Sequence, residues 1–216
     1  MTGPEIERLD GEIVYRNRWM RVREDRIRRS DGVEGIYGVV EKLDYALIVP
    51  FDGTRLHLVE QYRYAVGGRY WEFPQGSWED AADADMAIVA AGELAEETGL
   101  RAGSMLGIGR LFQAYGYATQ AAHVFLARDL RPGERALDDE EHGLITASFD
   151  VADVESMIDD GSIADAATVA AFHLFLRTLD RERRGSIDSA VREDGTSRTD
   201  MQNRLEDRAP GRQFLR

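Results

Sequence analysis

The sequence contains no cysteine, which excludes a disulfide framework and any metal site built on thiolates. Long hydrophobic runs are also missing, because the longest, residues 45–51, is far too short to cross a bilayer. The first ten residues are acidic and polar, unlike a signal peptide. We therefore expect a cytoplasmic protein with no membrane partner.

Basic residues are scarce, since 27 Lys and Arg face 40 Asp and Glu for a net charge of −13. The negative electrostatic field of such a chain repels nucleic acid. An anionic substrate would need a cation and local arginines to bind. Residues 181–216 differ, with nine Arg against seven Asp and Glu, a net charge of +2. We expect a strand-rich layer at 1–44, a main domain at 45–180, and a polar tail, partly helical or disordered, at 181–216.

Hydrophobic patterning predicts a mixed α/β fold. Helices are expected at 149–158, capped by Asp150, and at 165–179. Strands before and after a central helix, followed by two C-terminal helices, imply a mixed sheet between helical layers. The expected strands are 11–26, 35–40, 45–49, 55–62, 108–112 and 123–127.

Three carboxylates, Glu93, Glu96 and Glu97, occupy positions i, i+3 and i+4 of the central helix. They share one face, with Glu93 and Glu97 about 6 Å apart along the axis. Such carboxylates repel one another unless the face is solvated or holds a cation. Mg²⁺ takes oxygen ligands of this kind together with substrate phosphates. A solvated surface helix is the alternative, and the context decides between the two.

The context is a strand, a glycine loop, the acidic helix and a glycine stop. Aromatic and branched residues before Pro74 end a strand, and Pro74 and Gly76 indicate a tight loop. Asp83 or Asp85 can cap the helix, and Gly99 ends it. A loop beside a carboxylate cluster can offer backbone groups to a metal and a phosphate.

Residues 76–100 resemble the Nudix box, G-x5-E-x7-R-E-U-x-E-E-x-G-U, where U is a bulky aliphatic residue. The residues that match are Gly76, Glu93, Leu94, Glu96, Glu97, Gly99 and Leu100. The loop carries two extra residues, and the family's early Glu falls on Ala82 or Ala84. The family's Arg, which helps to orient the following Glu, is Gly92 here. We hypothesise that the two charges were lost as a set, so that Gly92→Arg alone should not raise activity.

Residues 11–178 further resemble the ADP-ribose pyrophosphatase branch of the Nudix family. The resemblance implies an α/β/α sandwich with a small N-terminal β layer that is exchanged across a homodimer. It places Trp19 on the substrate base and Arg63 on a phosphate, with Glu72 orienting Arg63. The alternatives are a Trp19 that fills the core and an Arg63 that only forms a salt bridge with Glu72.

The loop at residues 114–120 departs from this branch, because the proline associated with ADP-ribose specificity is absent. Gln120 stands where many members place a catalytic glutamate, and an amide cannot accept a proton as a carboxylate does. We expect Gln120 to contact substrate or water. Glu140 and Glu141 are the nearest alternative bases, and we select Glu141; a solvated loop is the alternative for this acidic run.

The resemblance implies Mg-dependent hydrolysis of a nucleoside diphosphate sugar, ADP-ribose first. Mg²⁺, with Mn²⁺ as a substitute, would be held by Glu93 and Glu97 with help from Glu96 and the Gln75 carbonyl. Arg101 is a second candidate for the phosphates. The alternatives are another nucleotide sugar of the GDP-mannose type, a damaged nucleotide, or a non-catalytic nucleotide sensor.

Overall fold

A computed structural model describes residues 4–135 and 143–194 of the chain. The chain divides into two units, Met1–Phe172 and His173–Arg216. Among the described residues, no helix combines the length and the apolar character that a membrane span requires.

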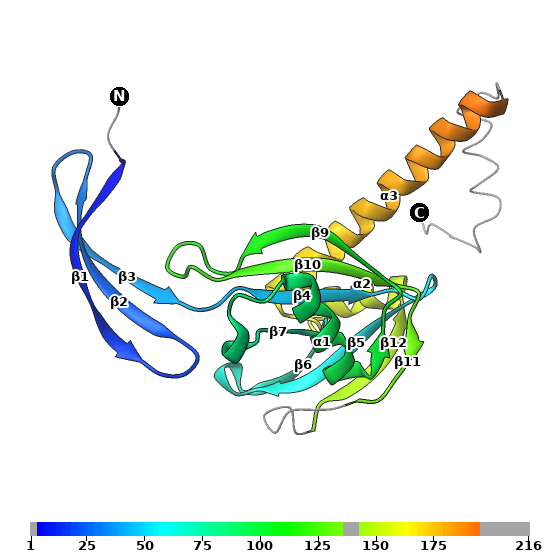
Figure 1. Ribbon diagram of the computed structural model, residues 1–216, viewed down its shortest axis with the longest axis horizontal. Helices are drawn as coiled ribbons and strands as arrows, with labels where there is room; N and C mark the ends of the chain where they lie inside the picture. The colour runs from blue at the N-terminus through cyan, green and yellow to red at the C-terminus, as the bar shows by residue number, and fades with distance from the viewer. Residues whose placement is uncertain (1–3, 136–142, 195–216) are drawn as a thin grey trace. The chain divides into compact units, whose positions relative to one another are not determined.

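The N-terminal layer is a three-stranded antiparallel sheet in the order β1-β2-β3 (Figure 1). The single strand expected at 11–26 is wrong, because the chain turns back at residues 17–20. The Asn17 side chain stabilises this turn by accepting hydrogen bonds from the backbone N–H groups of Trp19 and Met20, at 2.9 and 2.8 Å. The strands are β1 (Ile6–Arg16), β2 (Arg21–Arg29) and β3 (Glu34–Glu41).

The central sheet has the order β7-β4-β10-β9 and is mixed, as the sequence predicts. β4 (Tyr45–Pro50) runs parallel to β10 (Ala121–Arg128), while β7 (Gln75–Gly76) and β9 (Ser104–Phe112) are antiparallel to their neighbours. Every residue of β4 is buried, which agrees with its continuous run of apolar residues.

A second sheet has the order β12-β5-β6 and is antiparallel throughout. Its strands are β5 (Arg55–Arg63), β6 (Gly68–Glu72) and β12 (Ile145–Asp150). Four short elements complete the connections: η1 (Tyr64–Val66), η2 (Glu79–Ala81), β8 (Leu100–Arg101) and β11 (Arg131–Pro132).

Helix α1 (Met86–Thr98) begins after the second of the two predicted caps, Asp83 and Asp85, and ends at the predicted glycine. Asp85 caps it by accepting the N–H of Ala87 at 2.8 Å, and Gly99 ends it in the left-handed conformation. Its apolar face packs on the central sheet through a buried cluster. The members of this cluster are Ala46, Ile48, Val89, Ala90, Leu94 and Ala127.

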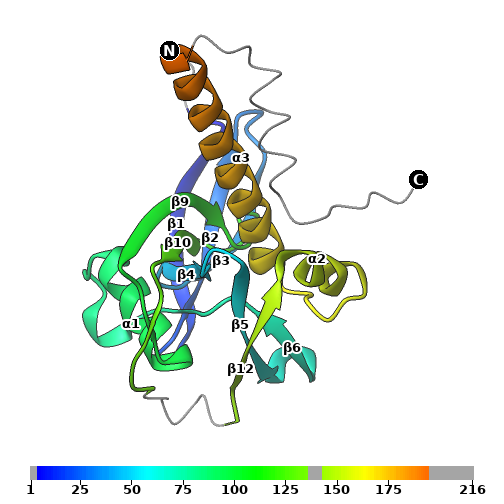
Figure 2. The ribbon, with the colours of Figure 1, turned by 90° about the vertical axis from the view of Figure 1, so that its right-hand side faces the viewer.

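Helix α2 (Val151–Asp159) lies against β12 and β5, and Figure 2 shows α1 and α2 on opposite sides of the strands. Asp150 precedes α2 as expected, but its side chain makes no capping hydrogen bond. It instead pairs with Arg55 across the sheet at 3.0 Å, because β12 and β5 place these two residues opposite each other.

Helix α3 (Ala166–Asp194) is much longer than the helix expected at 165–179. Asp165 caps its first turn by accepting the N–H of Thr168 at 2.8 Å. The helix continues as far as Asp194 through residues expected to belong to the polar tail.

Candidate active site

The loop that contains β7 contacts two of the three box glutamates. The backbone N–H of Gln75 donates to Glu97 Oε2 at 3.1 Å. The Glu93 carboxyl group lies directly on Gly76, since a Cβ at residue 76 would overlap it and lie 2.6 Å from Oε1. β7 is itself fixed to β4 by the pairs Ala46–Gly76 and Leu47–Gln75. The loop and the acidic helix therefore meet in a defined arrangement.

Burial separates the three glutamates. Glu93 and Glu97 are 6% and 1% exposed, and Glu96 is half-buried. The surface-helix alternative is therefore wrong for Glu93 and Glu97. Burying two carboxylates one turn apart costs free energy unless donors or a cation compensate.

The fit to a divalent cation depends on the donors. Carboxylate oxygens suit a hard ion, and glycine at residue 76 gives the Glu93 carboxyl group the room that any Cβ would take. In the described part of the chain, no three His, Cys, Asp or Glu side chains are grouped to hold a metal. Mg²⁺ commonly binds through few protein carboxylates, with substrate phosphates and water completing its shell, and the acidic helix could supply such carboxylates.

A cavity of about 710 Å³ opens beside this loop and contains the predicted phosphate ligand. Arg63 forms a two-pronged ion pair with Glu72, one bond of which, from Nε to Oε2, measures 3.1 Å. Gln61 Nε2 donates to the same carboxylate at 2.8 Å. The predicted salt bridge is thus present, and the Arg63 side chain is still 41% exposed beside it. The lining consists of Lys42, Tyr45, Arg63, Ala65, Val66, Tyr70, Glu72, Gln75, Gly76, Ser77, Gln113, Gln120, Ala164, Asp165 and Ala166.

Six polar residues of this cavity were not foreseen as site residues from the sequence: Lys42, Tyr45, Tyr70, Ser77, Gln113 and Asp165. Burial raises the pKa of the Tyr45 hydroxyl, which donates to Gln113 at 2.7 Å. Asp165 lines the cavity as well as capping α3. Tyr45 begins β4, Gln113 follows β9 and Asp165 precedes α3, so only the tertiary fold brings these three residues to one cavity.

The Glu72 carboxyl group gives the protein a pH-dependent stability. Burial raises its pKa above the ordinary value of 4.5, although the Arg63 guanidinium acts in the opposite direction. The folded chain then binds the proton more tightly than the unfolded chain, so this contribution to stability is lost as pH rises from 4.5 through the raised pKa. We expect this component to be absent in Glu72→Gln. Melting temperatures of both proteins across this range would test it, and parallel curves would contradict it.

Gln120 holds the main chain in place. Its Nε2 donates to the carbonyl oxygen of Leu43 at 2.8 Å, which joins the residue before β10 to the linker between β3 and β4. The loop at 114–120 is also bonded to β3, where the N–H of Val40 donates to Tyr117 at 2.7 Å and that of Thr119 donates to Val40 at 3.0 Å. A carboxylate at position 120 could not make the bond to Leu43, because it has no proton to donate.

We therefore expect Gln120→Glu to destabilise the protein and to bring no gain in turnover. The loss of one hydrogen bond and the apposition of two oxygens should cost about 1–3 kcal/mol, or several degrees in melting temperature. Gln120→Ala removes the donor without adding a charge, so the difference between the two variants isolates the repulsion. Faster turnover by Gln120→Glu would show that the position serves catalysis instead.

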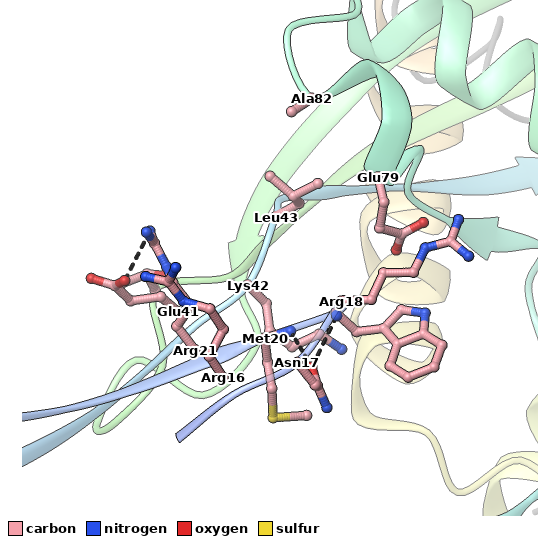
Figure 3. Close-up of a pocket in the computed structure, with 12 residues that line it drawn as sticks. Arg16, Asn17, Arg18, Met20, Arg21, Glu41, Lys42, Leu43, Glu79 and Ala82 are labelled. Atoms are coloured by element: carbon pink, nitrogen blue, oxygen red, sulfur yellow. Dashed lines mark hydrogen bonds and ion pairs between the residues drawn. The ribbon is translucent and has the colours of Figure 1, made fainter. Parts of the chain in front are cut away.

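Trp19 lies in a second cavity of about 520 Å³ and is 45% exposed, so the alternative that it fills the core is wrong. Figure 3 shows Arg16, Arg18, Arg21 and Lys42 around this cavity. Arg18 pairs with Asp80 at 3.6 Å and Arg21 with Glu41 at 3.0 Å. Lys42 lines both cavities, which are therefore neighbours. The cavity thus places an exposed aromatic ring beside basic side chains, of which Arg18 and Arg21 are paired with carboxylates.

Among the described residues, Arg101 and the three box glutamates are predicted site residues that line neither cavity. Arg101 is exposed on β8, pairs with β11 and lines neither cavity. Glu141 lies outside the described residues. The site that the described residues form therefore combines Arg63, Glu72 and Gln120 around one cavity, with Glu93 and Glu97 behind its Gln75–Gly76 edge.

The fold and the acidic helix define the class, and sequence profiles agree with them. The NUDIX domain profile matches residues 42–172, so the chain belongs to the Nudix family. A profile of the nucleoside diphosphate sugar hydrolase N-terminal domain matches residues 6–40.

The named relatives are more specific. The chain is 28% identical to an ADP-ribose pyrophosphatase of Mycobacterium tuberculosis, over 79% of this chain and 83% of the relative. It is 27% identical to the ADP compounds hydrolase NudE of Escherichia coli, over 77% and 89%. A crystal structure of an ADP compounds hydrolase superposes with a TM-score of 0.74 at 23% identity, covering 83% of this chain and 96% of that one.

These findings confirm the predicted family and its α/β fold. They make the protein a Nudix pyrophosphohydrolase of the ADP-ribose pyrophosphatase-like kind. Enzymes of this family generally use divalent metal ions.

Proposed function

We propose that the protein hydrolyses the pyrophosphate bond of ADP-ribose, giving AMP and ribose 5-phosphate, with Mg²⁺ or Mn²⁺ as the metal. The observation that carries the proposal is the pair of buried carboxylates, Glu93 and Glu97, fixed by the two residues that border the Arg63 cavity. The relative of Mycobacterium tuberculosis that is named an ADP-ribose pyrophosphatase supports the nucleotide.

Each residue has a separate task in this proposal. Glu93 and Glu97 would hold the metal, with Glu96 and the Gln75 carbonyl assisting. The bound metal supplies charge neutralisation of the diphosphate and a more acidic water. Arg63 would hold a phosphate through the face of its guanidinium that Glu72 leaves exposed. Trp19 would stack on the adenine in the neighbouring cavity.

Gln120 has no role as a base in this mechanism, because an amide does not accept a proton as a carboxylate does, and its nitrogen donates to Leu43. A proton leaving the water therefore needs another acceptor. The sequence offers Glu141 for this purpose, and we retain it as the candidate. Glu96, which is only half-buried, is an acceptor on the acidic helix itself.

The proposal is tested by following AMP and ribose 5-phosphate from ADP-ribose with Mg²⁺, Mn²⁺ or no metal. GDP-mannose and an oxidised nucleotide should be assayed beside it, because the missing loop proline leaves room for another substrate. We expect metal-dependent release of AMP from ADP-ribose, with a higher kcat/KM than for the other two substrates. Saturable binding of ADP-ribose without turnover under any metal would favour a nucleotide sensor.

We also propose that the protein acts as a homodimer through its N-terminal sheet. The strands β1 and β3 expose Ile13, Val14, Tyr15 and Ile36, of which Ile36 is 66% exposed. A three-stranded sheet gains stability when its apolar side chains are covered. Light scattering should give twice the chain mass, and a monomer at assay concentration would refute the proposal.

A further inference from the structure

Gly92 occupies a position where the backbone does not require glycine. It lies inside α1, and its φ is not in the left-handed region. Glycine within a helix costs about 1 kcal/mol relative to alanine. A Cβ at residue 92 would overlap Trp78 Cζ2 and lie 2.9 Å from Cη2. The close approach of the Trp78 ring is therefore the reason for glycine here.

Trp78 comes from the same loop that contacts the box glutamates. It follows Gly76 by two residues and precedes η2, with its carbonyl accepting the N–H of Ala81 at 3.1 Å. Its ring is half-buried and packs against the apolar cluster between α1 and the central sheet. An indole buries a large apolar area, so this contact stabilises the loop on the helix.

The loop thus contacts α1 at three successive points. Gln75 bonds Glu97, Gly76 lies on the Glu93 carboxyl group, and Trp78 lies on Gly92. The first contact is a hydrogen bond to the Glu97 carboxylate, and the second is the approach of the Glu93 carboxyl group to Gly76. The third is a rigid apolar contact one residue away from Glu93, and it sets how closely the loop approaches the helix.

We propose that Trp78 is the positioning residue of the acidic helix, and that its contact with Gly92 holds Glu93 in register with Gly76. The proposal rests on the proposed function in taking Glu93 and Glu97 as the groups that need positioning. It also explains the departure from the Nudix box at residue 92. A long side chain has no room there, because the loop provides the ring instead.

A double-mutant cycle tests the contact. We expect Gly92→Ala and Trp78→Leu each to lower kcat for ADP-ribose by about 10- to 100-fold with KM changed less than about twofold, as small misplacements of catalytic groups do. The kcat of the double variant should be no lower than that of the less active single variant, since both changes disrupt the same contact. Trp78→Phe, which keeps a ring, should recover most of the kcat.

A second measurement is the affinity for Mn²⁺ without substrate, determined by calorimetry. The ranking of the variants by this affinity should match their ranking by kcat. Gly185→Ala is the matched control, because it lies in helix α3 and its Cβ would meet nothing within 4 Å. It should leave both measurements unchanged.

Unchanged kcat and Mn²⁺ affinity in folded Gly92→Ala, or additive losses in the double variant, would overturn the positioning role. A wild-type protein without turnover would count against the proposed function alone. The order of Mn²⁺ affinities would still decide the role of Trp78, and a wild-type protein that binds no Mn²⁺ would overturn it.

Discussion

Glu97→Gln is expected to lower kcat/KM for ADP-ribose by about 100-fold or more, which corresponds to about 2.7 kcal/mol of transition-state stabilisation. Glu97 is 1% exposed and accepts the N–H of Gln75 at 3.1 Å. A glutamine has the same shape and can accept the same hydrogen bond through its amide oxygen. The fold should therefore survive while the negative charge that would hold the proposed cation disappears.

Kinetics with ADP-ribose, together with melting temperatures, would check this result. Glu155→Gln on α2 is the matched control, since it makes the same chemical change at an exposed position. It should retain the wild-type rate. Wild-type turnover in a folded Glu97→Gln protein would refute the assignment of Glu97 to the metal site.

Gly76→Ala should have an effect of similar size through a different route. A Cβ at this position would overlap the Glu93 carboxyl group, which would have to move. The φ of Gly76 is not in the left-handed region, so alanine brings no backbone strain and the effect is steric. We expect kcat/KM to fall by about 100-fold, because displaced catalytic groups lose that much for a shift of about 1 Å.

Gly107→Ala on β9 is the corresponding control, because its Cβ would meet Phe125 Cε1 at an ordinary 3.9 Å. The two variants should differ by about two orders of magnitude in kcat/KM, as the misplacement argument predicts. Equal activity would mean that Glu93 rotates away without cost, and that its observed position is not needed for turnover.

Local sequence signals predicted the acidic helix well. The cap at Asp85 and the stop at Gly99 depend on side-chain and backbone preferences within one turn, which sequence displays directly. The buried β4 followed from an unbroken apolar run. The turn at residues 17–20 was missed because its signal is a single Asn17 side chain that bonds two backbone N–H groups.

Contacts between distant residues were beyond the reach of such signals. The bond from Gln120 reaches Leu43, 77 positions away, so a residue read as a substrate contact is also a structural donor. The purpose of Gly92 likewise depends on where the Trp78 ring falls after folding. Both residues were conspicuous in the sequence as departures from a pattern, but their physical reasons are tertiary.

The hydrogen bonds between β3 and the loop at 114–120 have a consequence for how the site can open. Val40 both donates to Tyr117 and accepts from Thr119, and the Tyr37 hydroxyl donates to the Gly116 carbonyl at 2.5 Å. Such a loop cannot swing as an independent lid. The amide protons of Val40 and Thr119 should exchange with deuterium at similar rates, as members of one cooperative unit.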